Sequence, residues 1–108
     1  MLLLNVKVDT VSGLCRLVLS GEVDMDTVPL LHEVVGSGEG GILELDLSGV
    51  SFVDSTGLKG LLDINNAWQQ KGGQVLICKP QPDVEEVIRL VGLDKLLAQK
   101  DTLGGAER

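Results

Sequence analysis

An acid and two hydroxyls stand together at Asp54, Ser55 and Thr56, followed by Gly57, where an apolar run ends and a helical pattern begins. A polar side chain there can cap the helix, because it accepts hydrogen bonds from first-turn N–H groups that have no partner. Only one such side chain is needed. The same N–H groups and the helix dipole also favour an anion, including a phosphate on Ser55. The tetrapeptide therefore predicts a helix cap or a modification site and leaves both open.

Asp54 could also be the acid of an aspartic protease, since Asp-Ser/Thr-Gly triplets mark those enzymes, in which two such acids share a proton. In this chain Gly57 lies three positions after Asp54 rather than two, and the motif occurs once. Phe52 and Trp68 are the two aromatic residues that could line a substrate cleft. These observations argue against a protease.

Two other features invite a functional interpretation. The glycine-rich segment 36–41 resembles a phosphate-binding loop, but such loops run from a strand into a helix. This segment follows a helical pattern and precedes a strand pattern, and it contains Glu39 and no lysine. His32 has no acid or cysteine at a spacing that suits a metal or catalytic site. We expect a plain connection at 36–41 and a histidine at or near the surface.

Composition excludes several classes of protein. A chain of 108 residues is long enough for one domain with its own core. Its net charge of −7 and its two aromatic residues argue against nucleic-acid binding. No run approaches the roughly 18 apolar residues of a membrane span, and the opening segment lacks a signal peptide's basic region. Cys15 and Cys78 lie far apart in strand-like runs, as expected of reduced thiols. We predict a cytoplasmic protein without membrane insertion, whose acidic surface either suits a basic protein partner or serves only solubility.

Hydrophobic periodicity predicts the elements that position these residues. Four strands are expected, at 2–10, 14–20, 42–47 and 74–78. Three helices are expected: one capped by Asp26 or Thr27, one over 55–71, and one after a capping box of Asp83 and Glu86. Trp68 is expected to cover the edge of the core. Segment 93–100 is expected as a short helix or an edge strand, and residues 101–108 as a short flexible tail.

The order of these elements predicts the fold. Strand, strand, helix, strand, helix, strand, helix implies a mixed sheet with right-handed parallel crossovers. In the third strand Leu43, Leu45 and Leu47 alternate with Glu44 and Asp46, as in a strand covered on one face and wet on the other. We predict an α/β fold over residues 1–100, a two-layer sandwich of a mixed four- to five-stranded sheet with helices mainly on one face.

Four short motifs occur in a defined order along the chain. They are Gly21-Glu22-Val23-Asp24, the run from Leu45 to Leu58 that contains Asp54-Ser55-Thr56-Gly57, Lys71-Gly72-Gly73, and Val91-Gly92-Leu93. Together they resemble the bacterial anti-sigma factor antagonists of the STAS domain type, over about residues 4–97. Each motif is weak alone, but the four in this order are specific.

The resemblance implies a regulatory binding protein without a cofactor and not an enzyme. Ser55 is implied as the serine that an anti-sigma factor, itself a serine kinase, phosphorylates, with Thr56 as its unmodified neighbour. The residues implied at the partner surface are Asp24, Asp54, Thr56, Gly57 and Lys59. The unphosphorylated antagonist would bind the anti-sigma factor and free a sigma factor, phosphorylation would end this binding, and a PP2C-type phosphatase would restore it. The protein is expected to be a monomer or a weak dimer.

Two departures from the family pattern remain. Lys59 stands where the family often has glycine, one turn after Ser55, so it would either pair with a phosphate or be a solvated helix lysine. The short, glycine-broken tail suggests that the closing helix of the family is missing or reduced. The alternative function is a STAS subunit of a transporter complex or a sensory scaffold, in which Ser55 only caps the helix.

Overall fold

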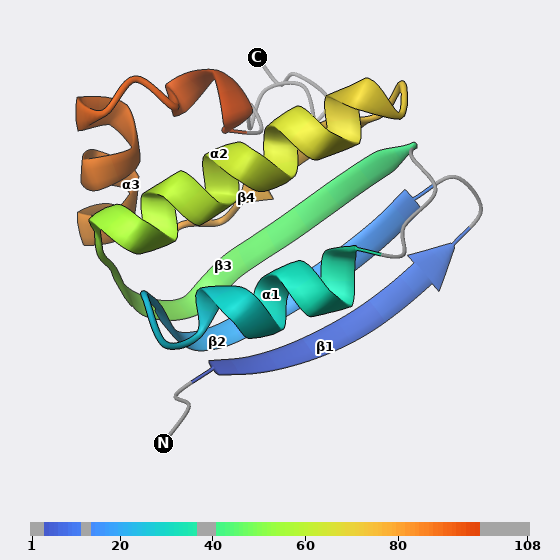
Figure 1. Ribbon diagram of the computed structural model, residues 1–108. Helices are drawn as coiled ribbons and strands as arrows, with labels where there is room; N and C mark the ends of the chain where they lie inside the picture. The colour runs from blue at the N-terminus through green and yellow to red at the C-terminus, as the bar shows by residue number, and fades with distance from the viewer. Residues whose placement is uncertain (1–3, 12–13, 37–40, 98–108) are drawn as a thin grey trace, which may run out of the picture.

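The computed structural model describes residues 4–11, 14–36 and 41–97. In these ranges the strands are β1 (Leu4–Val11), β2 (Leu14–Val23), β3 (Ile42–Val53) and β4 (Gln74–Cys78). The helices are α1 (Val28–Val35), α2 (Ser55–Gln70) and α3 (Pro82–Leu90), followed by a 3-10 helix η1 (Asp94–Leu96) (Figure 1). The expected flexible tail, 101–108, and the last part of segment 93–100 lie outside the described residues.

The strands form one mixed sheet in the order β1-β2-β3-β4. β1 pairs with β2 antiparallel, whereas β2, β3 and β4 run parallel to one another. The connections between the parallel strands place α1 and α2 over one face of the sheet (Figure 1). The predicted α/β class and the mixed sheet with helices on one face are confirmed.

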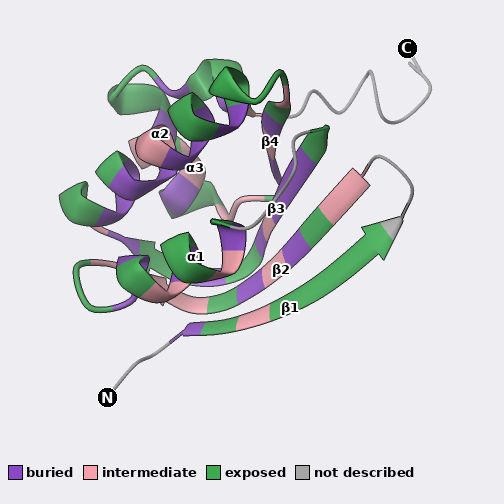
Figure 2. Ribbon diagram, turned by 45° about the vertical axis from the view of Figure 1, so that its right-hand side comes forward, coloured by how far each residue is buried: buried purple, intermediate pink, exposed green. Residues whose placement is uncertain are grey.

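The core lies between the sheet and the helices (Figure 2). Five strand leucines that face the helices are at most 1% exposed: Leu17, Leu19, Leu43, Leu45 and Leu47. The alternation predicted for the third strand is confirmed on this face. The other face is less wet than predicted, because Glu44 is only 9% exposed and receives a 2.8 Å bond from Nε of Arg16 on β2.

β3 is longer than predicted, because it continues through Ser48 and Gly49 to Val53 instead of ending at residue 47. The alternation stops at these two small residues, which favoured an early end. The strand nevertheless keeps pairing with β2, across irregularities in register that flank Gly21. A bulge changes which side chains face the core, so it breaks the period of two without ending the strand. The extra length carries Val53 to the end of β2.

The capping box predicted for α3 is wrong. The N-cap residue is Gln81, Pro82 takes the first helical position, and no side chain caps this helix. Proline suits that position, because its fixed φ is already helical and its missing N–H would have had no partner. Asp83 therefore lies inside the first turn, with its carboxylate exposed.

The remaining local predictions fall as follows. Segment 93–97 combines both expectations, since η1 is followed by a single parallel bridge from Leu97 to Ile77 of β4. Trp68 is 2% exposed and its Nε1 donates to the Gly41 carbonyl at 3.0 Å, so it closes the edge of the core as predicted. His32 is exposed, as expected. Within the described ranges, none of the helices has the length and apolar character required to cross a bilayer.

Candidate functional site

β2 and β3 end together at one edge of the sheet, at the left in Figure 1. Val23 pairs with Val53, and the Asp54 N–H donates to the Val23 carbonyl at 3.3 Å. This bond joins residues that are 31 positions apart in the sequence, so it brings the turn between β2 and α1 next to the start of α2. The carboxyl ends of parallel strands at such an edge are where α/β proteins place functional groups.

Asp54 is the N-cap of α2. Its backbone is extended (φ −96°, ψ −175°), and its Oδ1 accepts the Gly57 N–H at 2.7 Å. This is the standard bond from an N-cap side chain to the third helical residue. The helix cap predicted from the sequence is therefore present, and one carboxylate forms it.

Ser55 and Thr56 occupy the first two positions of α2, and both are exposed. Within the described part of the chain, neither hydroxyl makes a hydrogen bond. The cap does not use them, and neither does the core. A hydroxyl that is open to solvent at the first residue of a helix can be reached by the active site of another protein.

Gly57 is buried and allows the first turn of α2 to rest against the end of β2. A Cβ added to it would lie 2.1 Å from the Val23 carbonyl oxygen and 2.8 Å from its carbon. Because these are backbone atoms of a paired strand, they cannot move aside as a flexible side chain would. Gly57 thus fixes the position of Ser55 and Thr56 through packing.

Asp24 lies in the turn that leads from β2 to α1, and its carboxylate holds this turn together. Its Oδ1 accepts the N–H groups of Asp26 at 3.0 Å and Thr27 at 3.1 Å. Thr27 is the N-cap residue by position, as one of the two predictions had it, but its hydroxyl does not cap α1. It accepts the Asp24 N–H at 2.9 Å and donates to the Glu22 carbonyl at 2.7 Å. These hydrogen bonds fix both ends of the turn.

The same contacts bear on the protease alternative. An aspartic protease needs two carboxylates that share a proton. Here Oδ1 of Asp54 is bonded to Gly57, and Oδ1 of Asp24 is bonded to its own turn. Each acid stabilises the backbone of its own segment, so the arrangement does not resemble an acid pair.

Lys59 lies one turn after Ser55, and its ammonium group pairs with Asp63, one turn further towards the C-terminus of α2. Its Nζ is 3.1 Å from Oδ2 of Asp63, and its side chain is 74% exposed. An exposed pair of this kind contributes little to stability, about 0.3–0.5 kcal/mol. The Lys59 side chain is therefore accessible on the surface of α2, and breaking its ion pair with Asp63 costs little free energy.

Asp46 and Cys78, whose pKa values are shifted, lie on the face of the sheet away from α1 and α2. Burial would raise the pKa of Asp46, but hydrogen bonds from Ser48 and the charge of Lys79 hold it below its ordinary value. Burial, together with the charge of Glu44, raises the pKa of Cys78. Asp46 pairs with Cys78 between β3 and β4. Their pKa shifts therefore arise from contacts within the sheet and do not involve the residues around Ser55.

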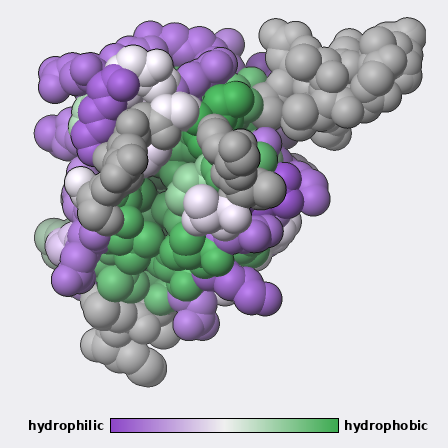
Figure 3. All heavy atoms as spheres, turned by 90° about the vertical axis from the view of Figure 1, so that its right-hand side faces the viewer, coloured by the Kyte–Doolittle hydropathy of each residue, from purple (hydrophilic) through white to green (hydrophobic). Residues whose placement is uncertain are grey.

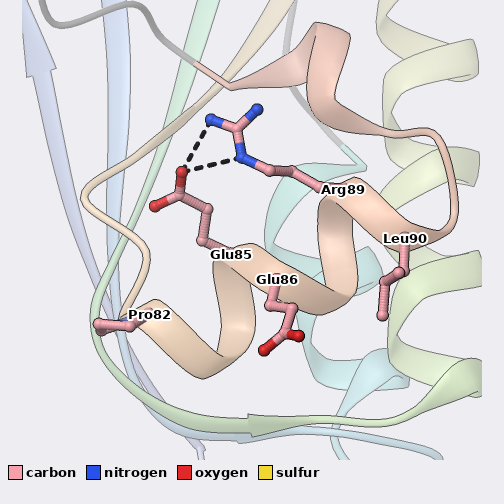
Figure 4. Close-up of a pocket in the computed structure, with 5 residues that line it drawn as sticks. All are labelled: Pro82, Glu85, Glu86, Arg89 and Leu90. Carbon is pink, nitrogen blue, oxygen red and sulfur yellow. Dashed lines mark hydrogen bonds and ion pairs between the residues drawn. The ribbon is translucent and has the colours of Figure 1, made fainter.

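A shallow hollow of about 400 Å³ runs along α3 (Figure 4). Its lining residues are Pro82, Glu85, Glu86, Arg89 and Leu90. Arg89 is already engaged, because Nε and Nη2 lie 3.0 Å and 2.8 Å from the same oxygen of Glu85. None of the five residues carries a hydroxyl or a thiol, so the hollow offers no counterpart to Ser55.

The structure thus brings Asp24, Asp54, Ser55 and Thr56 to one edge of the molecule, with Lys59 one turn further along α2. Sequence reasoning missed two residues at this edge, Met25 and Phe52, which are 67% and 48% exposed. In the sequence Met25 lies between Asp24 and Asp26 and Phe52 lies between Ser51 and Val53, and neither position distinguishes the residue from a core residue.

Comparison with known proteins gives consistent results. The chain is 28% identical over 98 residues to an anti-sigma F factor antagonist of Paenibacillus polymyxa, covering 87% of this chain and 84% of that protein. Its fold matches an anti-sigma factor antagonist from Mycobacterium paratuberculosis with a TM-score of 0.77 and 28% identity, over 97% of this chain and 95% of the other.

More distant structures share the fold alone. The anti-sigma factor antagonist SpoIIAA in its unphosphorylated form matches with a TM-score of 0.76 at 20% identity, over 94% of this chain and 97% of that one. A sulfate transporter family protein from Wolinella succinogenes matches with a TM-score of 0.72 at 16% identity, over 85% and 77%. A family model described as the STAS domain matches residues 5–106. The chain belongs to the STAS domain family.

Proposed function

We propose that this protein is an anti-sigma factor antagonist whose binding is controlled at Ser55. The unphosphorylated form binds an anti-sigma factor that is also a serine kinase, and a sigma factor is released. One observation carries the proposal: Asp54 alone caps α2, which leaves the Ser55 hydroxyl exposed and without a structural task. The names of the two relatives at 28% identity support the same function.

In the proposed reaction the Ser55 oxygen attacks the γ-phosphorus of ATP bound to the kinase. ADP leaves, and the hydroxyl proton passes to a base of the kinase. Thr56 stays unmodified beside it, and Asp24 and Asp54 form the acidic rim near the interface. A PP2C-type phosphatase would remove the phosphate and restore binding. The nucleotide belongs to the kinase, so this chain acts in the cytoplasm as a binding protein, without a cofactor or an enzymatic activity of its own.

Electrostatics alone can account for such a switch. A phosphoserine carries about −1.5 to −2 charges at neutral pH. A kinase places negative groups beside the hydroxyl that it modifies, namely a carboxylate base and the phosphates of the nucleotide. At about 6 Å from one carboxylate and an effective dielectric of about 20, the repulsion is roughly 4–6 kcal/mol. This weakens binding by roughly 10³- to 10⁴-fold, so no rearrangement inside the antagonist is required.

The test is phosphorylation in a defined mixture. The purified protein is incubated with ATP and, one at a time, the kinase-type anti-sigma factors encoded in the same genome, and intact mass is measured. We expect a gain of about 80 Da with one of them, lost in Ser55→Ala and kept in Thr56→Ala. Calorimetry should then show tight binding before the modification and weak binding after it.

The alternative function predicts a different pattern. A STAS subunit of a transporter or a sensory scaffold would use Ser55 only at the helix start, so it would bind its partner equally well before and after exposure to the kinases. The absence of a mass gain with every kinase, together with stable association with a transporter ATPase subunit, would favour this alternative.

A further inference from the structure

Two large apolar side chains stand in solvent beside the start of α2. Met25 is 67% exposed and Phe52 is 48% exposed. Each lies two residues from the hydrogen bond that joins Asp54 to Val23, Met25 after Val23 and Phe52 before Asp54. At this exposure they contribute little to the core, whereas methionine and phenylalanine are enriched at the centres of protein interfaces.

Hydrogen bonds hold the backbone of both residues in place. Met25 sits in the turn whose two ends are tied by the Asp24 carboxylate and the buried Thr27 hydroxyl. Phe52 is part of β3 and pairs with Glu22 of β2. Neither residue depends on a partner for its backbone position. Such preorganisation reduces the entropy lost on binding, because less of the chain must be ordered at the interface.

Along the chain, the charged residues nearest to these two side chains are acids. Between Arg16 and Lys59 the chain contains no lysine and no arginine. The same interval holds eight acids: Glu22, Asp24, Asp26, Glu33, Glu39, Glu44, Asp46 and Asp54. Of these, Glu22, Asp24, Asp26 and Asp54 lie within three residues of Met25 or Phe52 along the chain. Complementarity then favours a partner surface that places basic residues around apolar pockets.

Apolar exposure alone does not single out this edge. Hydrophobic side chains also gather at the end of the molecule where β3 begins (Figure 3), and Ile42 there is 39% exposed. Val8 on β1 and Leu90 on α3 are 55% and 77% exposed. Met25 and Phe52 differ from these because each lies two residues from the Asp54–Val23 hydrogen bond, next to the start of the helix that carries the exposed Ser55.

We propose that Met25 and Phe52 are the anchors by which this chain docks on its anti-sigma factor, whose docking face surrounds apolar pockets with lysines or arginines. The proposal rests on the proposed function. It assigns a different role to each group of residues at this edge. The two apolar side chains supply affinity, the flanking acids orient the partner, and Ser55 faces the kinase's own negative groups and so controls whether docking is possible.

The test measures binding of the unphosphorylated protein to the anti-sigma factor that phosphorylates it. Met25→Ser and Phe52→Ser should each weaken binding by about tenfold or more, as interface anchors do when truncated. Val8→Ser and Leu90→Ser serve as controls, because they remove exposed apolar side chains, 55% and 77% exposed, from β1 and α3. These controls should change affinity by less than about twofold. The ratio of affinities before and after phosphorylation should stay the same in all four variants.

The outcomes separate this proposal from the proposed function. If the wild-type protein binds and is phosphorylated while Met25→Ser and Phe52→Ser bind like the controls, the anchors are refuted and the function stands. Equal losses in all four variants would refute the anchors as well. If no kinase-type anti-sigma factor binds the wild-type protein, both proposals fall.

Discussion

The starts of α2 and α3 look alike in the sequence and differ in the structure. Each follows a strand and has an acid near its first turn, Asp54 and Asp83, and both acids are among the predicted cap residues. In α2 the acid is the N-cap and bonds Gly57 at 2.7 Å. In α3 the acid lies inside the first turn, behind Pro82, and no side chain caps the helix.

The difference shows what a helix start requires. α3 begins without any side-chain cap, and α2 begins with one. The start of α2 is capped by Asp54 and does not use the hydroxyls of Ser55 and Thr56, which therefore remain available for another protein. The same comparison separates the structural residues of the site, Asp54 and Gly57, from the exposed ones.

The largest effect is expected from placing the same phosphate at each helix start. Phosphoserine introduced during translation at position 55 should weaken binding to the anti-sigma factor by roughly 10³-fold or more, because the charge faces the kinase's negative groups. Phosphoserine at position 83 should change binding by less than about threefold, because an exposed charge outside the interface is screened. Calorimetry of both proteins checks this. Equal losses at both positions would mean that net charge, not position, controls docking.

A smaller but still large effect is expected for Gly57→Ala. Its methyl group would meet the Val23 backbone, which cannot give way, so we expect a loss of about 1–3 kcal/mol or more in the free energy of unfolding. Urea denaturation measures it. Gly36→Ala is the control, because Gly36 has helical angles (φ −59°, ψ −24°) at the end of α1 and an added Cβ would lie 3.0 Å from the His32 carbonyl oxygen, against 2.1 Å from the Val23 oxygen at Gly57. The unfolding free energy lost in Gly36→Ala should stay below about 1 kcal/mol. An unchanged midpoint for Gly57→Ala would show that α2 can shift away from β2.

The smallest effect is expected from removing the two acids. Asp54→Ala should cost about 1 kcal/mol of unfolding free energy, the usual value for a lost N-cap. Asp83→Ala should cost less than about 0.5 kcal/mol at moderate salt, because it removes only an exposed charge near the helix dipole. Paired urea titrations in one buffer measure both. The distinction between the two helix starts would be lost if the two variants lost equal stability.

The sequence predicts the order of the elements, the mixed sheet and a side-chain cap at Asp54 or Ser55, because each depends on local periodicity or on one short motif. It fails where a neighbouring residue overrides the pattern. Pro82 moves the start of α3 ahead of Asp83, and the irregular pairing around Gly21 extends β3 past Gly49. The Thr27 hydroxyl is diverted from capping by its bonds to the β2 end.

The candidate site is predicted only in part for a related reason. Acids and hydroxyls attract attention by type, so Asp24, Asp54 and Ser55 are found directly. Met25 and Phe52 are ordinary apolar residues in sequence, and only their exposure makes them candidates. Exposure depends on which segments the fold brings together, and here the meeting of the β2 and β3 ends decides it.

The position of Trp68 has a practical consequence. It is the sole tryptophan, it is buried, and it lies thirteen residues along α2 from Ser55, roughly 20 Å at the rise of an α-helix. Its emission spectrum should therefore change when the domain unfolds and remain unchanged when a tryptophan-free protein binds at the Ser55 end of α2. One fluorimeter cell could then follow melting by intrinsic emission and attachment by a dye on the partner, without interference between the two signals.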